Sequence, residues 1–196
     1  SIQPKWHSQN SDFATLDNLT NQGLLAVNKT IALQALISLG CNLDADSCRG
    51  ALNNAAVMGR HQSLSYQSVP VILDVAHNPA AALVLADKLI AQQGKTVAVA
   101  AVLEDKDWSS MVAQLNPAID YWHIAELTGI SRAAKGQSLL KLLYNAGIKG
   151  SLHDSVEQAF QLAIAKAGKT GNVVVFGSFH TVAAVLDFIS MEVSSE

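Results

Sequence analysis

The chain has 196 residues, of which 49% are apolar and 15% are charged, and its formal net charge is −3. This length suits one domain, or one domain with a small appendage, and the apolar content is enough for a buried core. The mildly acidic balance and the lack of a basic run argue against nucleic acid as a partner. No apolar stretch reaches the roughly 18 residues that a membrane-spanning helix needs, so we expect no membrane partner.

The first residues, SIQPKWHSQNSDF, contain neither a basic start nor an apolar segment, so they do not form a signal peptide. The chain does not begin with Met, and we therefore expect a piece of a longer protein. Its two cysteines, Cys41 and Cys48, lack the spacing of a redox or zinc motif. Reduced thiols and the missing signal peptide predict a cytoplasmic protein.

Residues 1–64 are expected to be polar at first and then helical. Apolar residues close to a helical stripe predict a helix from Asn28 to Leu39, just before a glycine. A second helix is expected from Asp46 to about Val57, and residues 59–62 form a connection. This region is predicted to be a unit of its own, separate from residues 65–196.

Beyond residue 65, short runs rich in β-branched residues alternate with helical patterns. The strands are expected at Val69–Val75, Thr96–Leu103, Ile119–Ala125, Ile148–Leu152 and Asn172–Gly177. The helices are expected at Pro79–Gln92, Asp107–Leu115, Gly136–Asn145 and Asp154–Ala167, the last with Asp154 and Glu157 as a capping box. Strands that are apolar on both faces suit a parallel sheet. The pattern predicts an α/β fold: a Rossmann-like, mostly parallel open sheet with helices on both faces.

The first of these strands ends in a carboxylate, Asp74. The neighbouring Asn78 and Pro79 are explained structurally, as the N-cap and the first residue of a helix. Asp74 has no such structural explanation, and a buried carboxylate without a partner is energetically costly. Ligands bind at the carboxyl ends of parallel strands, and an acid there suits ribose hydroxyls. A ligand contact and a structural pair both stay open for Asp74, and a structural role is favoured for His77.

The last strand runs into Gly177-Ser178-Phe179-His180-Thr181. A turn of small residues between a strand and a helix leaves free amides, which can bind an anion. From the motif alone, an ordinary turn in which Ser178 or Thr181 caps the final helix is favoured.

Two segments, Gly94-Lys95-Thr96 and Gly168-Lys169-Thr170, mimic the end of a phosphate-binding loop. The earlier glycine of that motif is missing in both, and both precede a strand rather than follow one. They are interpreted as helix C-caps. His123 and Glu126 have no further metal ligand near them in the sequence, so no metal site is predicted within this chain.

Three segments in one order carry a resemblance: DVAHNPAA, which starts at Asp74, VLEDKD (102–107) and FGSFHTV (176–182). Together they resemble the carboxy-terminal domain of folylpolyglutamate synthases, above all the bacterial enzymes that are also dihydrofolate synthases, which are relatives of the Mur ligases. MGRHQ (58–62) resembles the hinge before that domain. VNKTIALQAL (27–36) resembles the end of the central ATPase domain. The resemblance implies that residues 1–64 are the end of that ATPase domain with the hinge, and that residues 65–196 are the glutamate ligase domain.

The resemblance also implies roles for single residues. Asn28, Arg60 and Asp74 would contact ATP. Asp74, His77 and Ser178 would place the incoming glutamate, and His77 and Ser178 would be the catalytic residues. Two departures from the family pattern are His61, in place of a phenylalanine, and the loop 129–132, which lacks a Pro-Arg pair.

The implied reaction uses ATP and Mg²⁺, with the metal ligands in an amino-terminal part that precedes this chain. ATP phosphorylates the carboxylate of dihydropteroate or the γ-carboxyl of a folate, and L-glutamate attacks the acyl phosphate. We expect the isolated chain to be inactive, its partner to be the amino-terminal domain, and the parent enzyme to be a monomer. Two alternatives stay open: a Mur ligase that acts on a UDP-sugar peptide, and a non-catalytic nucleotide-binding α/β module.

Overall fold

The structure is a computed structural model, and it describes residues 24, 26–40 and 45–194. Contacts divide the chain into two units, residues 1–61 and 62–196. The described part of the first unit contains helices α1 (Ala26–Ser38) and α2 (Ala45–Asn54), both close to the predicted positions. Cys48 in α2 is a free thiol, whereas Cys41 lies outside the described residues.

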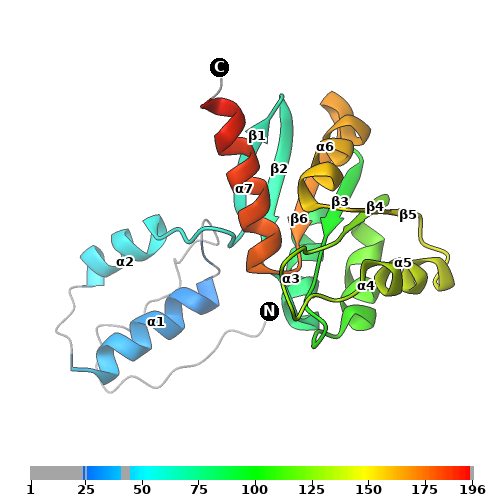
Figure 1. The fold of residues 1–196 in the computed structure, drawn as a ribbon. Helices are drawn as coiled ribbons and strands as arrows, with labels where there is room; N and C mark the ends of the chain where they lie inside the picture. Colours follow the sequence, from blue (N-terminus) through cyan, green and yellow to red (C-terminus); the bar gives the residue numbers. More distant parts are fainter. Residues whose placement is uncertain (1–23, 25, 41–44, 195–196) are drawn as a thin grey trace. The chain divides into compact units, whose positions relative to one another are not determined.

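The described residues of the second unit build one six-stranded sheet (Figure 1). Its strands are β1 (Gln62–Tyr66), β2 (Val69–Asp74), β3 (Thr96–Ala100), β4 (Tyr121–Ala125), β5 (Gly150–His153) and β6 (Asn172–Phe176). Their order across the sheet is β1-β2-β6-β3-β4-β5. All neighbours are parallel except β1 and β2, which form an antiparallel hairpin. The five predicted strands are confirmed, and β1 is an additional strand that the sequence analysis missed.

Helices cover both faces of this sheet, as predicted. They are α3 (Pro79–Ile90), α4 (Trp108–Leu115), α5 (Gly136–Asn145), α6 (Val156–Ala167) and α7 (Phe179–Val193), with the 3-10 turns η2 (Asn116–Ala118) and η3 (Gly168–Thr170). Successive residues of a strand face opposite sides, so Val173 and Val175 pack with α6 and α7, while Val174 and Phe176 pack with α3, α4 and α5. The α/β fold class is therefore confirmed. In the described part of the chain no helix is long and apolar enough to span a membrane.

The helix ends follow the predicted chemistry with two corrections. Asn78 caps α3, its side chain accepting the N–H of Ala81, and Pro79 is the first helical residue. Gly168 is the C-cap of α6 with a φ of 62°. Gly94 is not a C-cap, because α3 already ends at its C-cap Ala91. The predicted capping box of α6 is also wrong.

Helix α6 is capped by Ser155 and not by Asp154. The Oγ of Ser155 accepts the N–H of Gln158 at 3.2 Å, and the Oε1 of Gln158 accepts the N–H of Asp154 at 3.1 Å. The side chain of Gln158 thus reaches the N–H of Asp154, the residue before the cap, and not the N–H of Ser155 that a capping box requires.

Replacing Ser155 by alanine should lower the free energy of unfolding by about 1 kcal/mol, because the N–H of Gln158 loses its acceptor. The matched control is Asp154→Ala, which keeps the backbone N–H that Gln158 accepts. This control should cost less than about 0.5 kcal/mol. Urea denaturation of the two variants measures the difference, and a larger loss for Asp154→Ala would contradict the assignment of the cap.

Candidate functional site

The carboxyl ends of β2 and β6 lie side by side. Asp74, the last residue of β2, pairs with Phe176, the last residue of β6, and Phe176 also pairs with Ala100 at the end of β3. The three segments that follow these strands therefore leave the sheet at one edge. This edge is where parallel sheets bind ligands. The first and last of the parallel strands in the sequence are therefore neighbours in the sheet.

Asp74 lies inside this edge. Its side chain is only 3% exposed, and Oδ1 accepts the N–H of Ala76 at 2.8 Å. That bond holds the turn after β2, which gives the carboxylate a structural partner. Burial lowers the pKa of Lys88 on α3, and the negative charge of Asp74 acts in the opposite direction.

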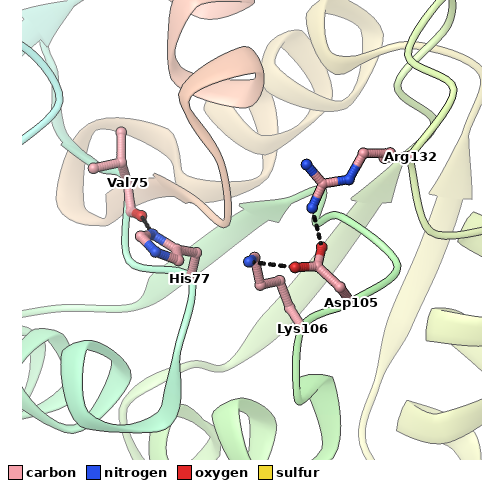
Figure 2. A network of polar contacts seen from close by, with 5 residues as sticks. All are labelled: Val75, His77, Asp105, Lys106 and Arg132. Atoms are coloured by element: carbon pink, nitrogen blue, oxygen red, sulfur yellow. Dashed lines mark hydrogen bonds and ion pairs between the residues drawn. The ribbon is translucent and has the colours of Figure 1, made fainter.

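His77 lies at the surface of the same turn and is half-buried. Its Nδ1 is 2.8 Å from the carbonyl oxygen of Val75 (Figure 2). A carbonyl can only accept, so Nδ1 carries the proton and, in the neutral ring, Nε2 keeps the lone pair. The fold therefore fixes one tautomer of His77 and leaves Nε2 as the basic atom.

Ser178 is the N-cap of α7. Its Oγ accepts the N–H of Thr181 at 3.1 Å and lies 2.7 Å from the Thr181 hydroxyl, which in turn donates to the carbonyl of Ala101 at 2.7 Å. The hydroxyl proton of Thr181 is donated to the Ala101 carbonyl, so the Ser178 hydroxyl must be the donor in its contact with the Thr181 hydroxyl. Ser178 is 5% exposed and Thr181 is fully buried. The capping role that the motif favoured is confirmed, and these bonds tie α7 to the segment after β3.

Cations lie at this edge as well. Asp105, after β3, accepts from Lys106 at 2.7 Å and from Arg132 at 3.1 Å (Figure 2). The bond from Lys106 is the largest cause that lowers the pKa of Asp105. The loop of Arg132 is held by backbone bonds, 2.8 Å from the Glu104 N–H to the Arg132 oxygen and 3.0 Å from the Ala134 N–H to the Val102 oxygen. The cluster of Asp105, Lys106 and Arg132 carries one net positive charge.

The two remaining predicted residues belong to the other unit. Asn28 is exposed in the first turn of α1. Arg60 follows α2, and its N–H donates to the Val57 carbonyl at 3.1 Å.

A metal centre is not evident in the part of the chain that the structure describes. No three His, Cys, Asp or Glu side chains there come close enough to hold an ion. Mg²⁺ prefers carboxylate and water oxygens in an octahedral shell, and these residues do not offer one. We therefore assign no chemical step to a metal held by this chain.

Comparison with known proteins identifies the family. The family model for the glutamate ligase domain of Mur ligases matches residues 59–179. The chain belongs to the Mur ligase family. The chain is 39% identical over 177 residues to the dihydrofolate synthase/folylpolyglutamate synthase of Escherichia coli K12. This match covers 89% of this chain and 40% of that relative.

Solved structures agree with this placement in the Mur ligase family. E. coli FolC in complex with ADP superposes with a TM-score of 0.80 at 37% identity, over 91% of this chain and 42% of that one. A bifunctional folylpolyglutamate synthase/dihydrofolate synthase with Mn, AMPPNP and L-glutamate bound gives a TM-score of 0.77 at 34% identity, over 88% and 41%. The chain spans about two fifths of the length of these relatives.

Lys106 and Arg132 were not predicted as candidates from the sequence. The signal for Lys106 was present, because it lies within the VLEDKD segment that carried the resemblance. Arg132 was considered only as part of a loop that departs from the family pattern. Their common contact with Asp105 joins segments 27 residues apart (132 − 105), and no local pattern reveals such a contact.

Proposed function

We propose that this chain forms one wall of the active site of an ATP-dependent amide ligase. The enzyme joins L-glutamate to dihydropteroate, or to the γ-carboxyl of a folate, in the cytoplasm. The observation that carries the proposal is the common edge of β2 and β6, where the segments from Asp74 and Gly177 lie side by side. Membership of the Mur ligase family and the names of its folate-branch relatives support it.

In the proposed reaction, ATP first phosphorylates the acceptor carboxylate. The amine of glutamate then attacks the carbonyl carbon of the acyl phosphate, the bond to the phosphate oxygen breaks, and inorganic phosphate leaves. The amine must also give up a proton. We assign this proton to Nε2 of His77, because Nδ1 is already committed to the Val75 carbonyl.

The other residues at this edge position the substrates in this proposal. Ser178 and Asp74 shape the turns beside the reacting groups through their bonds to Thr181 and Ala76. Lys106 and Arg132 attract the carboxylates of glutamate, since Asp105 neutralises only one of the two cations. Asp74 would also contact the nucleotide.

Residues 1–64 are proposed to be the end of a central ATPase domain, with Asn28 and Arg60 in contact with ATP. Gly59 has a φ of 68°, a left-handed conformation that suits glycine, and we propose that it belongs to the hinge. Closure of residues 65–196 over the phosphate-binding part would exclude water, which otherwise hydrolyses the acyl phosphate.

A chimaera tests the proposal. This chain replaces the matching part of the E. coli relative, and joining of labelled L-glutamate to dihydropteroate is measured with and without ATP. We expect ATP-dependent ligation by the chimaera and none by the 196-residue chain alone. The relative without its carboxy-terminal part serves as the negative control, and a UDP-sugar peptide serves as the alternative acceptor.

Two results would overturn the proposal. One is a folded chimaera that binds ATP and still joins no glutamate to a pterin acceptor. The other is ligation with the UDP-sugar peptide alone, which would move the chain to another branch of the family. Turnover by the isolated chain would refute only the statement that it forms a single wall of the site.

A further inference from the structure

The last two strands of the sheet carry a small polar cluster that the proposed reaction does not use. His123 on β4 points its Nδ1 at Nε2 of His153 on the edge strand β5, at 2.8 Å. The Oγ of Ser151 lies 3.2 Å from the first nitrogen and 2.8 Å from the second. The two rings are 4.9 Å apart between centroids. Ser151 pairs with His123 in the strand register, so the cluster fastens β5 to β4.

The proton positions in this cluster follow from burial. His123 is 5% exposed, and its Nε2 is buried without a hydrogen-bond partner. A buried N–H without an acceptor costs more than a bare lone pair, so the proton of His123 lies on Nδ1. Nδ1 then donates to Nε2 of His153, which must be unprotonated to accept. The neutral cluster therefore holds one proton between the two rings.

A second proton breaks the bond between the two rings. On Nε2 of His153 it would face the N–H of His123 and keep only the Ser151 oxygen, at 2.8 Å, as an acceptor. On Nε2 of His123 it would be buried without an acceptor. Burial first, then the charge of His153, then Lys166 and Lys95, lower the pKa of His123 to about 4. Burial also lowers the pKa of His153, against the opposing charge of Asp154.

The surroundings do not compensate for added charge. From α6, Lys166 lies over the ring of Tyr121, 3.8 Å from its centroid, and that ring is 5.1 Å from the ring of His123. Lys95 precedes β3 and adds a second positive charge. Among the described residues, Asp154, which follows β5, is the acidic group whose charge acts on His153, and it is exposed. Protonation must therefore disturb the contact between β4 and β5.

We propose that the cluster of His123, Ser151 and His153 is an acid-sensitive latch that holds the edge strand β5 to the sheet. Its opening is local, because β5 has four residues, all half-buried, and β4 is its sole strand neighbour among the described residues. Strands β2, β3 and β6 each have neighbours on both sides. Acid therefore frees β5 before it unfolds the rest of the sheet.

The direction of the pH dependence of opening follows from proton binding. The latched state binds fewer protons than the open state when the pH lies below the ordinary histidine value of 6.5 and above about 4. Acidification through this window therefore favours the open state. For His123 alone, opening at pH 5 should be about 20-fold more favourable than at pH 7.

Hydrogen exchange of the 196-residue chain at pH 7 and pH 5, corrected for the intrinsic exchange rates, tests the latch. We expect the opening of residues 150–153 to rise by about 20-fold at pH 5, with much smaller changes in β2 and β6. The double variant His123→Gln, His153→Gln should remove the rise. The single variant His153→Gln, at a half-buried position, should reduce it if the double variant does not fold.

The control is His180→Gln, which removes an exposed histidine of α7 and should leave the rise unchanged. An equal rise in β2, β5 and β6 would show general acid unfolding and would overturn the proposal. So would an undiminished rise in either variant of the latch. The test needs no nucleotide or substrate, so its outcome is independent of the proposed ligase activity.

Discussion

Replacing Gly177 by alanine is expected to lower the free energy of unfolding by about 3–5 kcal/mol. Gly177 joins β6 to α7 with a φ of 116°, a conformation that side chains rarely adopt. A Cβ there would lie 2.5 Å from the carbonyl oxygen of Ala101 and 2.8 Å from Cγ1 of Val102. Backbone strain costs about 1–3 kcal/mol and overpacking a similar amount.

The clash between the added Cβ and the Ala101 carbonyl also affects Thr181. The same carbonyl accepts the hydroxyl of Thr181, which receives that of Ser178. A shift of Ala101 therefore weakens the bonds that hold the start of α7, in addition to the direct clash. This coupling places the expected loss toward the upper end of the range.

Gly147→Ala is the matched control for Gly177→Ala. Gly147 also has a positive φ, 72°, but an added Cβ there meets nothing within 4 Å. Backbone strain alone should cost about 1 kcal/mol. Urea denaturation followed by the fluorescence of the buried Trp108 and Trp122 compares the two. Equal losses would contradict the close approach of the two segments at the carboxyl edge.

Much of the fold could be predicted because its central strands are unusually uniform. β3 and β6 are buried along their whole length, and strands of this kind are apolar on both faces and rich in β-branched residues. Helix α5 was predicted with its observed bounds, because Gly136 and Asn145 delimit a clear apolar stripe. These elements are specified locally, so the sequence alone identifies them.

The edge strand β1 lacked such a signal. Its residues Gln62–Tyr66 alternate between partly buried and exposed, and most are polar. The turn to β2 consists of Gln67 and Ser68, with φ values of 49° and 65°. Such hairpin turns usually contain Asn-Gly or Asp-Gly. Without glycine, the sequence gives no sign that the chain reverses here.

The candidate site divides in the same way. Asp74, His77 and Ser178 could be predicted as candidates because they lie at or just after strand ends within recognisable segments. The bond from the Thr181 hydroxyl to the Ala101 carbonyl could not be predicted, since it joins residues 80 positions apart. The one-residue error at Ser155 has another origin, because adjacent Asp and Ser are both good N-caps. Only the tertiary position of α6 decides between them.

In the chimaera, replacing His77 by glutamine is expected to lower kcat for glutamate ligation by about 10²–10⁴-fold. Nδ1 is held by the Val75 carbonyl, so the ring presents the unprotonated Nε2 to the attacking amine. Glutamine fills a similar volume but its amide is not basic. The KM for ATP should change little, because in the proposed mechanism His77 acts on the amine and not on the nucleotide.

The matched control for His77→Gln is His153→Gln. It makes the same exchange at another half-buried histidine, on the far edge strand β5, and it should retain kcat within about twofold at pH 8, since neutral histidine is the stable form there. Binding of ADP by both variants, measured by calorimetry, separates a loss of catalysis from a loss of folding.

The most direct test of the central claim is the ligation rate of the chimaera with His77→Gln, measured at saturating ATP and L-glutamate. The claim is that the neighbouring carboxyl ends of β2 and β6 carry the reacting groups. It predicts that the ligation rate falls by at least about 10²-fold while ADP binding is retained. A rate within about twofold of the unmodified chimaera would place the proton acceptor elsewhere and contradict it.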